Sequence, residues 1–300
     1  MQDNTLADFA QKHHIENLTL PSLLALSAGH NGYSLTKAKR LLKFQRRINA
    51  ELLNHRIITH NPYTAWFEQG DQSLTQIKAF IIQFSVFSNQ FLIAQLNKMI
   101  HAETLESMRA SKEILANEIG VRFKPTAPTN GGDALGSTEG SIEGGIFHFG
   151  AGHFEWLYHI AKKLDLSFAD IGQPKHGTPS TLFFCNELIR LYGGDDYQIS
   201  QAASYAVENW AAAGFWGQLI KGFRRFNEIN GADLPLGFFV WHDQLESQHA
   251  AHTQEELEEL YFTLELDEDE FIRHGNQMLD GVAAFWDGLD AQRRELAAVH

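Results

Sequence analysis

Cysteine is almost absent from this chain of 300 residues, since Cys185 is the only one. One thiol cannot form an intrachain disulfide, and zinc knuckles and CxxC redox pairs are excluded because they need several thiolates. Basic residues are also scarce: 24 lysines and arginines stand against 37 aspartates and glutamates, which gives a net charge of −13. This balance argues against nucleic-acid binding driven by phosphate neutralisation.

A long uninterrupted apolar segment is missing as well. The most apolar run, residues 79–96, is interrupted by polar residues that include Gln83, Ser85, Ser88, Asn89 and Gln90. The opening segment MQDNTLADFAQKHH lacks the charged and then apolar layout of a signal peptide. We therefore expect a cytoplasmic protein that does not act at a membrane.

Hydrophobic residues make up 44% of the chain and include 22 Phe and 6 Trp, enough for a sizeable core. Apolar residues recur at helical spacing and β-branched alternation is absent, which predicts an all-α protein. We expect a helical extension over residues 1–50 and a helical domain over 51–300. Within that domain the glycine-rich insert at 121–152 is expected to have little structure of its own, and 196–223 is expected to form one helix.

The segment Leu236–His252 carries the strongest functional pattern, because His242, Glu246 and His249 lie at i, i+4 and i+7. This spacing places all three on one narrow stripe of a helix. Such a stripe is costly to bury unless a partner such as a divalent metal compensates it. A solvated face is the ordinary alternative, but the same helix also carries Phe238, Phe239, Trp241 and Leu245.

Three more polar residues stand on apolar helical faces: Glu118, His153 and Glu208. Each alone has an ordinary explanation as a solvated glutamate or a satisfied core histidine. Glu118, however, lies at a helix carboxyl end, where the dipole disfavours it, and Glu208 has no Lys or Arg at i±3 or i±4. With the triad they give three carboxylates and three imidazoles, a set that suits iron or manganese better than structural zinc. A ferritin-like bundle would need a second ExxH motif, and Glu246–His249 is the only match.

Over roughly Asn54–Leu289 the chain resembles the haem-oxygenase-like di-iron oxidase and oxygenase superfamily, which is related by fold to the TenA and PqqC proteins. The opening RIITHNPYTAWFEQG is similar to the start of the family domain, and FWDGL near the end is also family-like. LANEIG resembles the family signature L-x-N-L-x-E-E-x-G, GHFEWLYHIAKKLDL its HxxLxxxxxxxLGL helix, and HDQLESQH its HxxxDxxH triad.

This resemblance implies an all-α, haem-oxygenase-like (TenA/PqqC-like) helical bundle and six metal ligands: Glu118, His153, Glu208, His242, Glu246 and His249. It also implies two Fe(II) ions per chain, O2 as co-substrate and a homodimer. The implied reaction desaturates, cleaves or oxygenates a small organic substrate, such as a fatty-acid- or amino-acid-like carboxylate. The arginines that could pair with such a carboxylate are Arg109, Arg190, Arg224 and Arg225.

Two departures from the family pattern leave alternatives open. Glu246 replaces the usual aspartate and is one methylene longer, so we expect the second metal position to be weakened. The insert separates Glu118 from His153, which leaves Glu143 as a rival first carboxylate. The same fold also permits two other functions. One is a metal-free TenA-like hydrolase or lyase with Cys185 as nucleophile, and the other is a non-catalytic binding protein.

Overall fold

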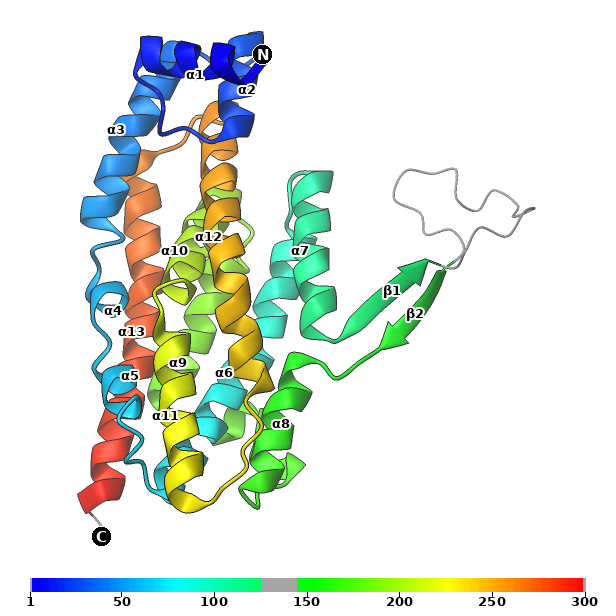
Figure 1. Ribbon diagram of the computed structural model, residues 1–300, viewed down its shortest axis with the longest axis vertical. Helices are drawn as coiled ribbons and strands as arrows, with labels where there is room; N and C mark the ends of the chain where they lie inside the picture. Colours follow the sequence, from blue (N-terminus) through cyan, green and yellow to red (C-terminus); the bar gives the residue numbers. More distant parts are fainter. Residues whose placement is uncertain (1, 126–144, 299–300) are drawn as a thin grey trace.

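Long helices packed side by side form the body of the molecule (Figure 1). The computed structural model describes residues 2–125 and 145–298, with the side chains of these ranges except 2–5, 122–125, 145–149 and 245–252. Outside one β-hairpin the regular elements of these ranges are helical, which confirms the all-α prediction. The helices are α1 (Gln2–His13), α2 (Leu20–Ala28), α3 (Leu35–Glu51), α4 (Arg56–Thr59), α5 (Pro62–Phe67), α6 (Leu74–Ile100), α7 (Leu105–Glu118), α8 (His153–Lys163), α9 (Pro179–Glu187), α10 (Tyr197–Ala211), α11 (Phe215–Asn230), α12 (Gly237–Thr263) and α13 (Glu268–Ala298).

Helix α6 is central and contacts α7, α8, α9 and α13. By length and composition it could cross a membrane, but half of its most apolar window is buried within the bundle. Its polar residues fix a loop against the helix: Gln83 Nε2 donates to His176 O, and Asn89 Nδ2 donates to Gly172 O. These polar interruptions therefore have structural partners, and the apolar residues between them serve the core.

Aromatic side chains account for most of the core between α5, α6, α11, α12 and α13. Phe80, Phe84 and Phe239 are fully buried, and the Phe80 and Phe84 rings lie 5.2 Å apart. Trp286 of α13 packs against Phe84 in this cluster and is 1% exposed. Each buried aromatic ring contributes roughly 1.5–3 kcal/mol by leaving water, so a cluster of this size can hold the helices together without a cofactor.

The expected single helix over 196–223 is wrong, because the chain turns between α10 and α11. The turn passes through Gly214, whose φ of 85° is the left-handed conformation that favours glycine. The surrounding AAAG run is apolar throughout, so periodicity alone did not mark the break.

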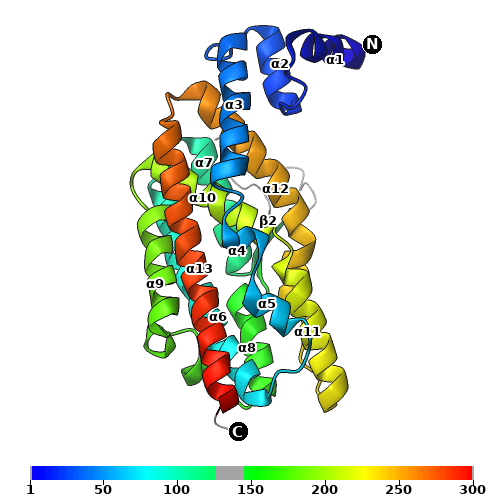
Figure 2. The ribbon, with the colours of Figure 1, turned by 90° about the vertical axis from the view of Figure 1, so that its left-hand side faces the viewer.

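Helices α1 to α3 form an extension at one end of the molecule (Figure 2). The carboxylate of Glu258, on α12, is fully buried and fastens this extension. It accepts hydrogen bonds from the backbone N–H and hydroxyl of Thr19, at 2.9 and 2.6 Å, and from Gln45 Nε2 at 3.3 Å. The start of α2 is thus anchored to the helix that also carries His242.

The two ends of the glycine-rich insert pair as an antiparallel hairpin, β1 (Val121–Pro125) with β2 (Gly145–Phe149). The expectation that 121–152 lacks structure of its own is therefore wrong at these ends. Both segments, VRFKP and GIFHF, are rich in strand-forming apolar and aromatic residues, a signal that the glycines on either side obscured. The hairpin projects from the bundle and joins the end of α7 to the start of α8 (Figure 1).

Candidate metal centre

Three predicted ligands come together at one point, from three different helices. Glu118 is the last residue of α7, His153 is the first residue of α8, and His242 lies near the start of α12. One potential ligand atom from each lies within 4.8 Å of the others. A carboxylate and two imidazoles at this spacing can bind a divalent metal ion.

Glycines at the base of the hairpin bring Glu118 and His153 together. Gly120 has a φ of 74°, and a Cβ there would lie 2.5 Å from Gly150 O. A Cβ on Gly152 would lie 2.8 Å from Glu118 O. The backbone N–H of Gly150 donates to Gly120 O at 2.8 Å. Because only glycines permit this approach, α7 ends where α8 begins, although the insert separates them in sequence.

The contact between Glu118 and His153 is close but is not a hydrogen bond. Glu118 Oε2 lies 2.8 Å from His153 Nδ1. The pair lacks the direction of a hydrogen bond, so this buried nitrogen has no hydrogen-bond partner among the described residues. His153 is only 5% exposed. Buried polar atoms normally have partners, and a nitrogen left without one beside a carboxylate fits a metal ligand.

His242 is held with one nitrogen directed at a backbone carbonyl. Its Nδ1 lies 2.7 Å from Phe238 O, and if Nδ1 carries the proton and donates, Nε2 is left as an electron-pair donor. Backbone carbonyls orient metal-binding histidines in this way. The ring also stacks on Trp216, with centroids 4.7 Å apart, and lies 4.8 Å from the His153 ring. Aromatic rings thus pack against both imidazoles.

Glu208 lies outside this group of three. It is half-buried on α10, and Lys98 of α6 is within its electrostatic reach. Burial lowers the pKa of the Lys98 ammonium, whereas the charges of Glu256 and Glu208 act to raise it. The Lys98 Nζ donates to Ser204 Oγ at 2.5 Å. Lys98 was not predicted from the sequence. The only signal is that it is a lone basic residue in the last turn of an apolar helix.

The remaining predicted ligands cannot be placed by their side chains. Helix α12 runs unbroken through positions 246 and 249, so the helical spacing to His242 is maintained. The side chains of Glu246 and His249 lie outside the described residues, and so does the whole of the rival Glu143. Of the two candidates for the first carboxylate, Glu118 is the one that contacts His153.

The fold is haem-oxygenase-like, as the sequence resemblance implied. No family model matches the sequence, and no curated protein matches it. Among solved structures, it is similar to a domain of unknown function with a haem-oxygenase-like fold from Shewanella denitrificans, with 14% identity, a TM-score of 0.55 and coverage of 88% of this chain and 95% of that one. It is also similar to a CADD-like protein of unknown function from Nostoc punctiforme, with 16% identity, a TM-score of 0.55 and coverage of 87% and 99%. At these identities the likeness establishes the fold alone.

Proposed function

We propose that this protein is a non-haem di-iron oxidase or oxygenase that uses O2 to oxidise a small organic substrate, by desaturation, cleavage or oxygenation. The observation that carries the proposal is the convergence of Glu118, His153 and His242, whose ligand atoms lie within 4.8 Å of one another. We also propose that the enzyme is a cytoplasmic homodimer.

The donor set fits iron. One carboxylate oxygen and two imidazole nitrogens suit Fe(II), and the set has no thiolate that would favour structural zinc. Iron bound there would supply the redox chemistry with O2. The protein's own part is to orient the two imidazoles, to offset part of the metal charge with Glu118, and to keep water out with Trp216 and Phe238 beside His242.

A second iron would draw on Glu208, Glu246 and His249. Glu246 is longer than the family's aspartate, and Lys98 places a positive charge within electrostatic reach of Glu208. The longer side chain changes the position that the Glu246 carboxylate would offer, and the Lys98 charge opposes a second cation because like charges repel more strongly inside a bundle than in water. We therefore expect the second position to bind iron more weakly than the first.

The metal-free alternative has little support from the environment of Cys185. The thiol is 2% exposed, and burial raises its pKa to about 12. A nucleophilic cysteine needs a lowered pKa and access to substrate, so Cys185 has the properties of a core residue. A Cys185→Ser variant is expected to retain the activity of the wild type.

Anaerobic calorimetry with Fe(II) tests the proposal. The wild-type chain is expected to bind the first iron tightly and a second one weakly, and O2 is then expected to oxidise the bound iron. His242→Ala removes a ligand whose side chain is only half-buried, so it should lose the tight site and keep the wild-type circular dichroism spectrum. If wild type binds no iron, or His242→Ala binds it unchanged, the proposal is wrong.

A further inference from the structure

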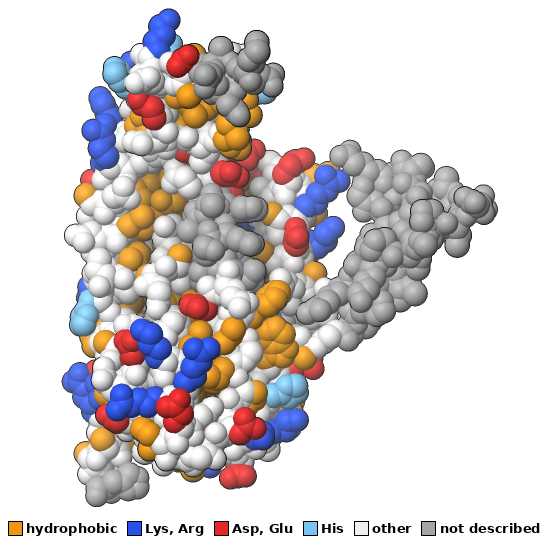
Figure 3. All heavy atoms as spheres, in the orientation of Figure 1, with side chains coloured by type: hydrophobic (Ala, Val, Ile, Leu, Met, Phe, Trp, Pro, Cys, Tyr) orange, Lys and Arg blue, Asp and Glu red, His pale blue; other side chains and the backbone are white. Residues whose placement is uncertain are grey.

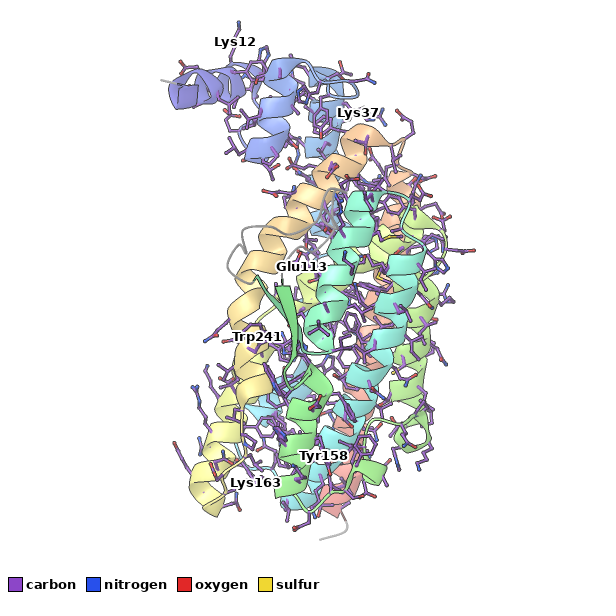
Figure 4. The ribbon with its side chains drawn as sticks, turned by 90° about the vertical axis from the view of Figure 1, so that its right-hand side faces the viewer. Lys12, Lys37, Glu113, Tyr158, Lys163 and Trp241 are labelled. Atoms are coloured by element: carbon purple, nitrogen blue, oxygen red, sulfur yellow. The ribbon has the colours of Figure 1, made fainter. Side chains whose placement is uncertain are left out.

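A cavity of about 510 Å³ opens beside the candidate metal centre, between the end of α7, the start of α8 and α12. His153 lines it, together with Trp156, Trp241 and Glu113. Glu113 and Trp241 lie on the face from which the hairpin projects (Figure 4), and hydrophobic side chains gather on the bundle surface next to the hairpin (Figure 3). The volume is in the range of small-molecule sites, and the shared His153 places any occupant next to the candidate metal centre.

The charges around this cavity favour a cation over a carboxylate. Glu113 is the one charged group among its described lining residues, apart from the titratable His153, and none of these residues is a lysine or arginine. The four arginines that the sequence offered for a substrate carboxylate are all absent from this lining. A carboxylate here would have no described basic partner, whereas an ammonium ion would have Glu113.

Two indole rings supply the second element of a cation site. The Trp156 and Trp241 rings stand almost perpendicular, at 87°, with centroids 6.0 Å apart. Trp156 also packs on His153, at 5.4 Å between centroids. The face of an indole attracts cations more strongly than any other side-chain ring, and perpendicular aromatic walls are a common way to bind alkylated ammonium groups.

We propose that the substrate is an organic ammonium ion, and that its cationic group binds in the cavity between Trp156, Trp241 and Glu113. This inference rests on the proposed function for its chemistry, but the binding itself does not need the metal. The apolar groups attached to the cationic nitrogen would lie against the indoles, and His153 at the inner end would hold the metal next to the bound molecule.

Calorimetry on the metal-free full-length chain tests this, with choline as probe. Its uncharged isostere 3,3-dimethyl-1-butanol and the carboxylate hexanoate serve as comparisons. Choline is expected to bind and the other two to bind at least tenfold more weakly. Trp241→Leu should weaken choline binding about five- to thirtyfold, as expected for the loss of one cation–π contact. Glu113→Gln should weaken it by a smaller factor that vanishes at high salt, because Glu113 is exposed.

Glu259→Gln is the matched control, because Glu259 lines a separate acid-lined pocket of about 340 Å³ between α7, α10 and α12. Choline binding should be unchanged in this variant. The proposal is overturned if choline does not bind, if the isostere or hexanoate binds as tightly, or if Glu259→Gln weakens binding and Glu113→Gln does not. Fe(II) titration of the same samples separates this failure from failure of the proposed function. Glu113→Gln, at an exposed site, keeps the test valid if Trp241→Leu does not fold.

Discussion

Replacing Gly120 by alanine should weaken metal binding, although residue 120 is not itself a ligand. Two costs are expected. An alanine at a φ of 74° costs about 1–2 kcal/mol, because its Cβ crowds the carbonyl oxygen in the left-handed region. The same Cβ would lie 2.5 Å from Gly150 O and 2.8 Å from Gly152 N, and these are backbone atoms that cannot rotate away. The strands must then separate, which moves Glu118 away from His153.

Gly29→Ala isolates the first cost from the second. Gly29 has a similar φ of 68°, but a Cβ there meets nothing within 4 Å. Gly29→Ala should lose about 1–2 kcal/mol of unfolding free energy in urea, and Gly120→Ala should lose more because of its backbone clash. Gly120→Ala alone should also bind Fe(II) about 10- to 100-fold more weakly, the loss typical when the support of a ligand is disturbed. Equal iron affinity in the two variants would refute the claim that the glycine contacts position the site.

Three further predictions concern the ligands, the insert and the buried thiol. Glu208→Ala should keep the tight Fe(II) site of Glu118, His153 and His242 but lose the weak one, and calorimetric stoichiometry would contradict this if both sites persist. Because Pro125 pairs with Gly145, replacing residues 126–144 by a two-residue Asn-Gly turn should leave iron affinity within about twofold of wild type, and a larger loss would show that the insert supports the centre. Burial raises the pKa of the Cys185 thiol from 9.0 to about 12, so the stabilising effect of its protonated form is complete below pH 9 and is lost as pH rises from 9 towards 12. The unfolding free energy of wild type should therefore fall by about 1.4 kcal/mol relative to that of Cys185→Ala between pH 8 and pH 10. Urea unfolding that gives the same difference between the two proteins at both pH values would rule this out.

Residue type and helical spacing were sufficient to predict the all-α fold class and a set of six candidate ligands that includes the three residues that converge. Glu118, His153 and His242 each stood out as a polar side chain on an apolar face, and this local property can be read from a single sequence. The pairing of Glu118 with His153 could not be read in this way. It depends on backbone contacts that Gly120 makes with Gly150 and Gly152. Gly120 is distant from both in sequence, and the hairpin brings them together in space.

Two other features depended on tertiary packing. Lys98 has an ordinary position near a helix end, and only the tertiary fold brings it within electrostatic reach of Glu208 on α10 and Glu256 on α12. The turn at Gly214 was hidden for a related reason, because one glycine within an alanine run is compatible with a helix as well as with its end. In both cases the local sequence permits two structures, and contacts with other helices decide between them.

The hairpin stem is expected to separate the geometry of the candidate metal centre from the sequence of the insert. Since β1 and β2 pair up to Pro125 and Gly145, we expect that the segment between them can change in length or composition without altering the distance from Glu118 to His153. A motif that requires a fixed spacing between the glutamate and the first histidine would therefore overlook such a site. Relatives are better sought by aligning the LANEIG and GHFEW flanks separately, with a gap of any length allowed between them.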